Sequence, residues 1–198
     1  MNAPKTIPLM YESEFNMGRK VENIGQLYFD QAYLGKTAET SRWDNNLVLS
    51  NMEKASKREP MKYGADGLKI HDGAIKYKSY IEGRQGIVVG GEDPWVEAIF
   101  LHHGAGKLLM VEFGKIISEH PQIDTMVLKE FTGAFINGRI EQFDFGMSFS
   151  SLEHDGLGWY GDVLNPIGDL QSMAMMLSVI KPGGLMFFLS QLQTVLMD

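Results

Sequence analysis

Short apolar runs alternate with helix-forming segments over the C-terminal half of this 198-residue chain. Consecutive parallel strands need a long crossover, usually a helix, so this alternation is typical of a mostly parallel sheet covered by helices. The runs are too short for helices of ordinary length and rich in branched or aromatic residues, as buried strands are. Five such strands are predicted: 86–89, 108–111, 125–128, 143–149 and 185–189.

Two connecting segments have clear helical signals. Asp93 is a good N-cap residue and Pro94 fits the first helical position, so a helix is predicted from there to Gly104. Residues 169–180 are predicted as an amphipathic helix that ends at the turn 181–184. Its predicted apolar face comprises Leu170, Met173, Met176, Leu177 and Ile180.

Residues 1–82 differ in texture, because they are polar and have few sustained apolar runs. Helices are predicted at 21–33 and 46–57. A loop-rich segment is expected after them, around Gly64, Gly67 and Gly73. We therefore predict an N-terminal extension or cap over residues 1–82 and an α/β domain over residues 83–198.

Composition excludes several classes of function. The net charge is −7 and no basic run occurs, so nucleic acid is not expected as a partner. With no cysteine, the chain has no disulfide, thiolate metal site or cysteine nucleophile. No apolar stretch reaches the length of a membrane span, and the N-terminus lacks a signal peptide. The default expectation is a soluble, cytoplasmic protein.

A glycine turn follows the first predicted strand. Gly90 and Gly91 let the backbone approach a ligand closely, and Glu112 ends the next strand about 20 residues later. In dinucleotide-binding folds an acid at that place accepts hydrogen bonds from a ribose diol. The alternatives are a simple tight turn and a solvated acid at a strand end.

A polar segment follows the fourth predicted strand, where the strand order of such sheets reverses and ligands bind. It begins with Ser150, Ser151, Glu153 and His154, and His154 could act as a general base near neutral pH. Alternatively, Glu153 and His154 only hold this loop in place by hydrogen bonds. Together with Asp155 and Asp162 they show no diagnostic metal-ligand spacing, so no metal is predicted.

At these residues the chain resembles the class I S-adenosylmethionine-dependent methyltransferases. The matching segments are Val88–Glu92, Val111-Glu112 and Ile180–Leu185. A closer resemblance covers residues 78–189. It is to the methyltransferase-like family called domain of unknown function 268, through segments 143–162 and 164–169.

The resemblance implies a Rossmann-like methyltransferase sheet that binds S-adenosylmethionine. By position, Gly90, Gly91 and Glu112 would hold this cofactor, with Ser150 and Ser151 beside it. His154 and Glu153 would be the catalytic residues, on the side of the methyl acceptor. The acceptor itself, a small molecule or another class, is not implied.

The chain departs from the full methyltransferase pattern in two ways. Seven strands complete that sheet, whereas only nine residues follow Leu189 here, so the sheet is expected to stop after the fifth strand. The bare edge at 185–189 would need cover from the N-terminal region or from a second subunit in a homo-oligomer, unless the chain is a shortened form. The usual first motif has an acid before or among three spaced glycines, whereas here only Gly90 and Gly91 occur, followed by Glu92 and Asp93. The charge of these two acids disfavours a phosphate at the start of the helix.

The leading functional prediction is therefore an S-adenosylmethionine-dependent methyltransferase-like protein. A cationic sulfonium tolerates the acids beside the turn better than the phosphates of NAD do. The alternative is a catalytically inactive interaction module with the methyltransferase fold. A third possibility is an enzyme of NAD or nucleotide-sugar chemistry on a related sheet.

Overall fold

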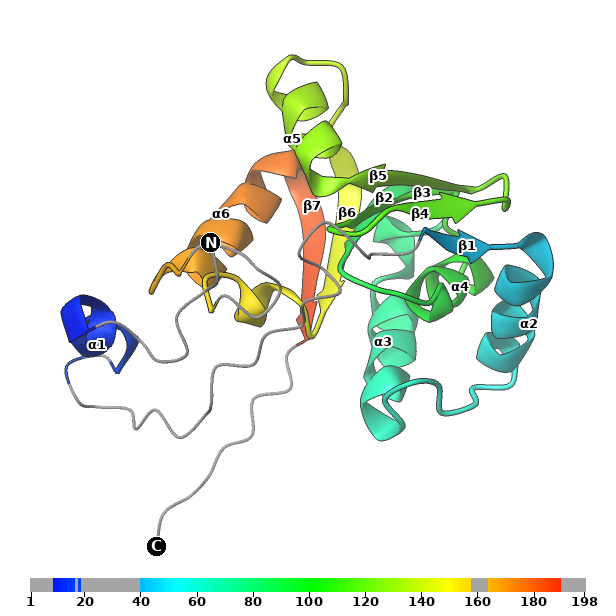
Figure 1. The fold of residues 1–198 in the computed structure, drawn as a ribbon. Helices are drawn as coiled ribbons and strands as arrows, with labels where there is room; N and C mark the ends of the chain where they lie inside the picture. Colours follow the sequence, from blue (N-terminus) through cyan, green and yellow to red (C-terminus); the bar gives the residue numbers. More distant parts are fainter. Residues whose placement is uncertain (1–8, 17, 19–39, 158–163, 190–198) are drawn as a thin grey trace, which may run out of the picture. The chain divides into compact units, whose positions relative to one another are not determined.

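The computed structural model describes residues 9–16, 18, 40–157 and 164–189 (Figure 1). The chain divides into two compact units. The sheet unit comprises Glu39–Ser151 and Met176–Asp198, and the second unit comprises Met1–Ala38 and Leu152–Met175. Each unit is described by itself below.

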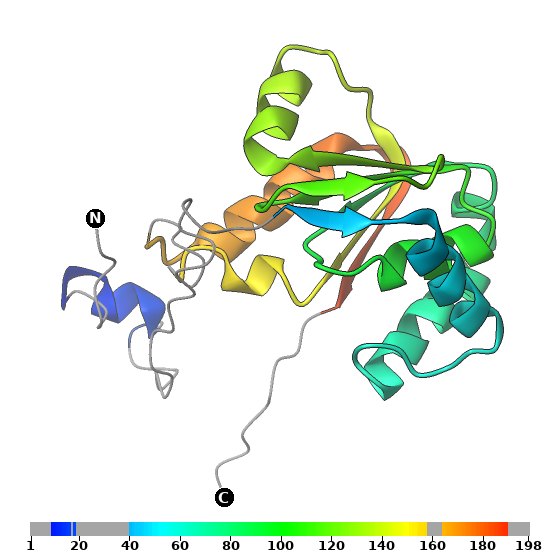
Figure 2. The same ribbon diagram turned by 45° about the vertical axis from the view of Figure 1, so that its right-hand side comes forward.

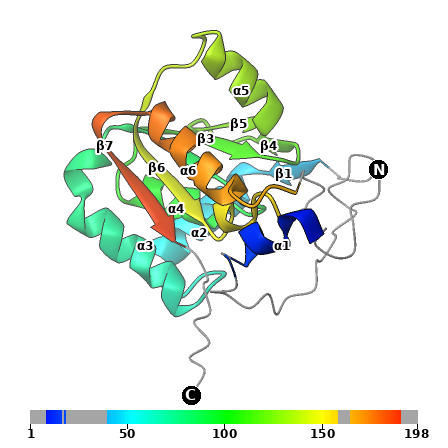
Figure 3. The ribbon, with the colours of Figure 1, turned by 90° about the vertical axis from the view of Figure 1, so that its left-hand side faces the viewer.

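The sheet unit is built on five parallel strands in the order β5-β3-β2-β6-β7. Figure 3 shows β7 at one edge, beside β6. The first strand of this sheet along the chain is β2, in the middle. The next two strands, β3 and β5, extend the sheet on one side of β2, and the last two, β6 and β7, extend it on the other side. This reversal creates a topological switch point between β2 and β6. The predicted α/β, Rossmann-like fold is confirmed, with strands β2 (Gln85–Val89), β3 (Lys107–Glu112), β5 (Ile123–Val127), β6 (Phe143–Phe149) and β7 (Ile180–Leu189).

Three of the predicted helices form close to their predicted bounds. They are α2 (Asn45–Ser56), α4 (Trp95–His102) and α6 (Gly168–Val179). The predicted turn 181–184 lies inside β7, where Ile180 pairs with Phe143 and Leu185 with Phe145. Four residues of β7 therefore face one residue of β6 as an irregularity in the ladder.

Helices α2, α3 (Ala65–Lys76) and α4 cover one face of the sheet, and α5 (Leu128–Ile136) lies on the other (Figure 2). The core between the sheet and the three helices includes Val48, Ile70, Phe100 and Phe145, all fully buried. Burying such a side chain contributes about 1.5–3 kcal/mol, so the helices between residues 45 and 76 are integral to the stability of the sheet unit. The predicted domain boundary at residue 82 stays a prediction.

The expected loop around Gly67 and Gly73 is wrong, because both glycines lie within helix α3. A Cβ at Gly67 would lie 3.4 Å from the Trp95 ring, and one at Gly73 would lie 2.9 Å from the Phe187 ring. Glycine therefore serves here to bring a helix close to aromatic side chains of the core. Single-sequence patterns cannot separate this use from a loop.

The predicted apolar face of the 169–180 helix is wrong in part. Met176 is buried, but Leu170 and Leu177 are 59% and 63% exposed. Apolar residues lie on every side of α6, so their spacing does not single out the face that packs.

Two short strands were not predicted. Strand β1 (Ser41–Trp43) pairs in parallel with β4 (Ile116–Ser118), just beyond the end of β3. The remaining short helices are α1 (Leu9–Phe15), η2 (Lys78–Tyr80) and η3 (Leu152–His154).

Within the described ranges, β7 pairs only with β6, so no described strand covers the predicted edge. The predicted helix at 21–33 and the tail 190–198 lie outside the described residues. No helix in the described part of the chain has the length and apolar character needed to cross a membrane.

Candidate functional site

The turn between β2 and α4 lies at the switch point and requires glycine at its first position. Gly90 has a φ of +80°, in the left-handed region that disfavours other residues. Its N–H donates to the Val111 carbonyl at 3.1 Å, which ties the turn to β3. A Cβ at Gly90 would overlap the Ser151 side chain, so the absence of a side chain also admits a close neighbour.

Glu112 lies directly against this turn. Its Oε2 accepts a hydrogen bond from the Gly91 N–H at 2.6 Å, and its Oε1 accepts one from the Phe113 N–H at 2.7 Å. Burial raises the pKa of Glu112, and the backbone N–H groups of Gly91, Phe113 and Gly114 oppose that rise. A carboxylate has about four acceptor positions, so about one remains beyond these three groups.

Asp93 does not cap helix α4, contrary to the prediction. Pro94 occupies the N-cap position, and no side chain caps the helix there. The Asp93 Oδ1 instead accepts a hydrogen bond from Asn51 Nδ2 of α2 at 3.0 Å. The proline shifts the helix start by one residue and frees the aspartate for a contact between helices.

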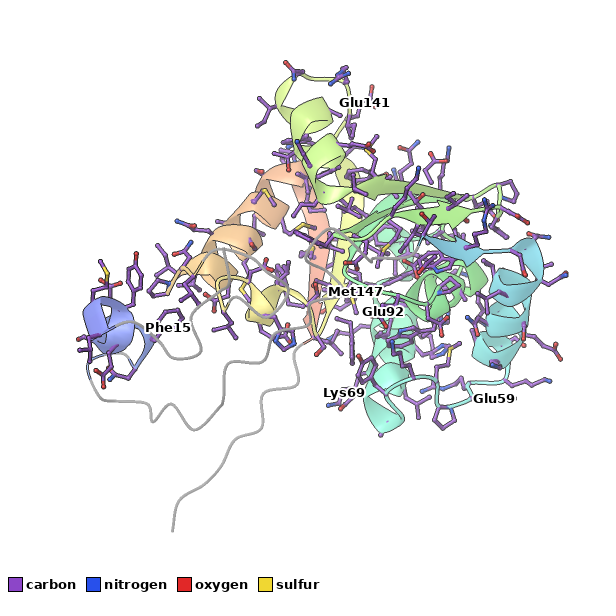
Figure 4. All side chains as sticks on the ribbon, in the orientation of Figure 1. Phe15, Glu59, Lys69, Glu92, Glu141 and Met147 are labelled. Carbon is purple, nitrogen blue, oxygen red and sulfur yellow. The ribbon has the colours of Figure 1, made fainter. Side chains whose placement is uncertain are left out.

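Neighbouring elements also hold the loop that contains Glu92. The Trp43 Nε1 donates to the Glu92 carbonyl at 3.1 Å, and Lys62 Nζ lies 3.5 Å from Glu92 Oε2. The Lys62–Glu92 pair is well exposed, so it contributes little to stability. Figure 4 labels Glu92 in this loop and Met147 in the core-facing row of β6.

Ser150 and Ser151 follow β6 in the same unit. Ser150 has a φ of +46°, which is unusual for a residue other than glycine, and its N–H donates to the Leu189 carbonyl at 2.8 Å. Ser151, the next residue, lies beside Gly90. The structure thus brings together the five residues predicted to bind a cofactor: Gly90, Gly91, Glu112, Ser150 and Ser151.

Glu153 and His154 lie in the short helix η3, which belongs to the second unit. Within that unit the loop after η3 is closed by backbone bonds. The Asn165 N–H donates to the Gly156 carbonyl at 2.8 Å, and the Gly168 N–H donates to the Asn165 carbonyl at 2.9 Å. These bonds tie residues 165 and 168 to the loop after η3.

Three acids and one histidine were considered together for a metal site: Glu153, His154, Asp155 and Asp162. Asp162 lies outside the described residues. Among the residues that are described, no three His, Cys, Asp or Glu side chains group as a metal site.

Sequence reasoning missed Glu97, in the first turn of α4. The residue is only 1% exposed, and its Oε1 has no hydrogen-bond partner in the described part of the chain. Burial raises the pKa of Glu97 to about 8, and the nearby charges of Asp93 and Glu112 add to the rise. The available signal was an acid within the otherwise apolar run Trp95–Leu101.

A histidine pair at the other end of α4 was also missed. His103 Nε2 and His71 Nδ1 lie 3.2 Å apart, and His71 is 1% exposed. Burial lowers the pKa of His103 to about 4 and lowers that of His71 as well. His103 therefore pairs with another imidazole.

A cavity of about 520 Å³ lies at the opposite end of the strands. Its lining includes Gln85, Lys107 and Phe143, which begin β2, β3 and β6, and Arg139. Lys107 is paired there with Asp124 at 2.7 Å. Open parallel sheets bind ligands beyond the carboxyl ends of their strands, so this cavity is separate from the glycine turn.

Comparison with known families gives one match. Residues 83–194 match the family model described as "Caenorhabditis protein of unknown function, DUF268". A search of curated proteins found no match to the chain. The match begins near the predicted start of the α/β domain and includes β2, β3, β5, β6 and β7.

Proposed function

The chain belongs to the DUF268 family, and we propose that it is an S-adenosylmethionine-dependent methyltransferase-like protein. The observation that carries this proposal is the 2.6 Å hydrogen bond between the Gly91 N–H and Glu112 Oε2. It joins the glycine turn after β2 to the acid at the end of β3, beside the switch point of a five-stranded parallel sheet.

The donor and acceptor set of this site fits the ribose of an adenosine cofactor. Glu112 keeps about one acceptor position beyond the N–H groups of Gly91, Phe113 and Gly114, and a ribose hydroxyl could donate to it. Gly90 and Gly91 present backbone without side chains next to that carboxylate. Gly90, Gly91 and Glu112 would thus hold the sugar, as the sequence predicts.

The charge around the turn favours a cationic cofactor. Glu92, Asp93 and Glu112 are all acids, and Lys62 Nζ lies 3.5 Å from Glu92 Oε2. A phosphate here would be repelled, whereas a sulfonium would be attracted. This supports S-adenosylmethionine over NAD or a nucleotide sugar.

When bound, S-adenosylmethionine supplies an activated methyl group. The chain would contribute position and, for a hydroxyl or amine acceptor, a base that takes the departing proton. We propose His154 for that base and Glu153 as its neighbour in η3, both of which belong to the second unit. The identity of the acceptor forms no part of the proposal.

Calorimetry on the full chain tests the proposal directly. S-adenosylmethionine or its demethylated product should bind at millimolar concentration or better, and Glu112→Gln should weaken binding at least tenfold. Glu119→Gln, at an exposed acid of the same unit, is the matched control and should bind as the wild type does. Absence of binding to both ligands would refute the proposal.

A second function is favoured by one specific contact. Ser151 lies so close to Gly90 that it occupies the space that a side chain there would fill. If that packing is permanent, the turn is structural and the fold serves as an interaction module without catalysis. In that case His154→Ala leaves the cellular phenotype intact, whereas substitutions on an exposed face abolish it.

A further inference from the structure

The cavity at the N-terminal ends of the strands has the size of a site for a small organic molecule. Its volume is about 520 Å³, and such sites commonly hold about 300–1,000 Å³. Strands β2, β3 and β6 contribute their first residues to the lining, and the loop between α5 and β6 contributes Arg139 and Ile140 (Figure 1). Every lining residue belongs to the sheet unit, so the cavity is complete within that unit.

Part of the lining is apolar and belongs to the packed interior. Leu109 and Phe143 border the cavity, yet they are only 9% and 6% exposed. Ile140 lies beside them in the lining and is partly buried. Because neighbouring elements hold these side chains in place, this wall is formed before any ligand arrives. An apolar group laid against it would leave water, which favours binding.

The charged side chains of the lining are Lys107, Asp124 and Arg139. Lys107 Nζ lies 2.7 Å from Asp124 Oδ2, so these two charges compensate each other. The Arg139 side chain is exposed, and its guanidinium has no ion pair or hydrogen bond with any described residue. The lining therefore carries one cation in excess, in a chain whose net charge is −7. A guanidinium offers a planar fork of donors that matches the two oxygens of a carboxylate.

We propose that this cavity binds a small organic acid, with its carboxylate on the Arg139 guanidinium and its apolar body against Leu109 and Phe143. The negative charge of Asp124 in the lining disfavours a phosphate dianion relative to a singly charged carboxylate. The glycine turn lies at the opposite end of β2, so this ligand is distinct from the proposed cofactor. The inference uses no part of the proposed function, and each can fail alone.

NMR titration of the isotope-labelled full chain with phenylacetate tests the proposal. The amide signals of Lys107, Arg139 and Phe143 should shift with phenylacetate concentration, whereas those of Gly90 and Gly91 should stay in place. Phenylacetamide has nearly the same shape but no charge. It should bind at least about tenfold more weakly, because it loses charge-assisted hydrogen bonds to the guanidinium. Phenyl phosphate should also bind more weakly than phenylacetate.

Arg139→Gln is the decisive variant, because its side chain is exposed and its loss leaves the core intact. It should bind phenylacetate at least about tenfold more weakly than the wild type. Arg58→Gln is the matched control, since Arg58 is exposed and does not line the cavity. It should bind phenylacetate as the wild type does.

Four results would overturn the inference. They are no shift of the cavity amides at millimolar phenylacetate, shifts at the glycine turn in their place, equal affinity for phenylacetamide, and unchanged affinity in Arg139→Gln. Tighter binding of phenyl phosphate would overturn the assignment to a carboxylate. In each case a parallel titration with S-adenosylmethionine decides the proposed function separately, through the signals of Gly90 and Gly91.

Discussion

Helix α4 has a buried titratable group at each end, an acid at its N-terminal end and two imidazoles at its C-terminal end. At the N-terminal end, Glu97 faces other acids and keeps an oxygen without a partner. At the C-terminal end, His71 Nδ1 and His103 Nε2 lie 3.2 Å apart, and His71 Nε2 has no hydrogen-bond partner among the described residues. Each end thus keeps one buried polar atom without a described partner, and burial favours the neutral form of both the acid and the imidazoles.

The two ends also respond to pH with opposite sign. Glu97 is protonated in the folded protein up to pH about 8 but ionises near 4.5 when unfolded, so stability falls as pH rises through that window. His103 stays neutral down to pH about 4 but is protonated below about 6.5 when unfolded, so stability rises with pH there. The two slopes therefore partly cancel between about pH 4.5 and 6.5.

The largest effect is expected from Gly90→Ala, which disturbs the turn that precedes the N-terminal end of α4. The substitution forces alanine into left-handed backbone and its Cβ into the Ser151 side chain. The free energy of unfolding should fall by about 3 kcal/mol in urea denaturation. Adding Ser151→Gly should restore the part of the lost stability that comes from overlap between the alanine Cβ and the Ser151 side chain. If Gly90→Ala were as stable as the wild type, the turn geometry would be contradicted.

Glu97→Gln should remove the decrease in stability that the wild type shows as pH rises from 4.5 to 8. The neutral amide has no charge to bury, so the variant should gain about 2 kcal/mol of stability at pH 8 and almost nothing at pH 4.5. Thermal unfolding across pH 4.5–8 measures the difference. A constant offset from the wild type at every pH would show that Glu97 does not titrate in this range.

His71→Leu should remove much of the increase in stability that the histidine pair causes as pH rises from 4 to 6.5. Without its partner in the buried pair, the variant should lose about 1 kcal/mol at pH 7 and depend less on pH between 4 and 6.5. Lys54→Gln, at an exposed residue of α2, is the control and should keep the wild-type profile. If the stability of His71→Leu depends on pH as that of the wild type does, other groups must cause the loss of stability at low pH.

The smallest effect concerns the bond that holds Asp93 away from the helix cap. Asn51→Ala should lower the free energy of unfolding by about 1 kcal/mol, because Asn51 Nδ2 donates to Asp93 Oδ1 in a partly buried setting. A double-mutant cycle with Asp93→Ala isolates the coupling between the two side chains. A coupling energy near zero would mean that solvent replaces this bond.

The sequence predicted the sheet well because its strands are buried and strongly apolar. Residues 143–149 form β6 within their predicted bounds, and the turn at Gly90 lies where the strand pattern placed it. Local signals failed where tertiary contacts decide. Gly67 and Gly73 favour a loop by propensity, yet they lie in α3 because aromatic side chains pack closely against them.

The candidate site was predictable only in part, for the same reason. Glu112 stands at a fixed interval after a glycine turn, and that interval is visible in the chain. The raised pKa of Glu97 depends on its burial and on acids contributed by different elements. The His71–His103 pair joins residues 32 positions apart, and no local pattern links them.

The hydrogen bond between the Trp43 indole and the Glu92 carbonyl provides an intrinsic fluorescence reporter next to the glycine turn. The Trp43 indole is almost fully buried and donates to the carbonyl of Glu92, while Trp95 begins α4 and packs against Tyr63 and Phe149. One indole thus bonds to the residue that follows the glycine turn, and the other lies at the start of the helix after it. A rearrangement of that turn would change their fluorescence, so occupancy could be followed without any label.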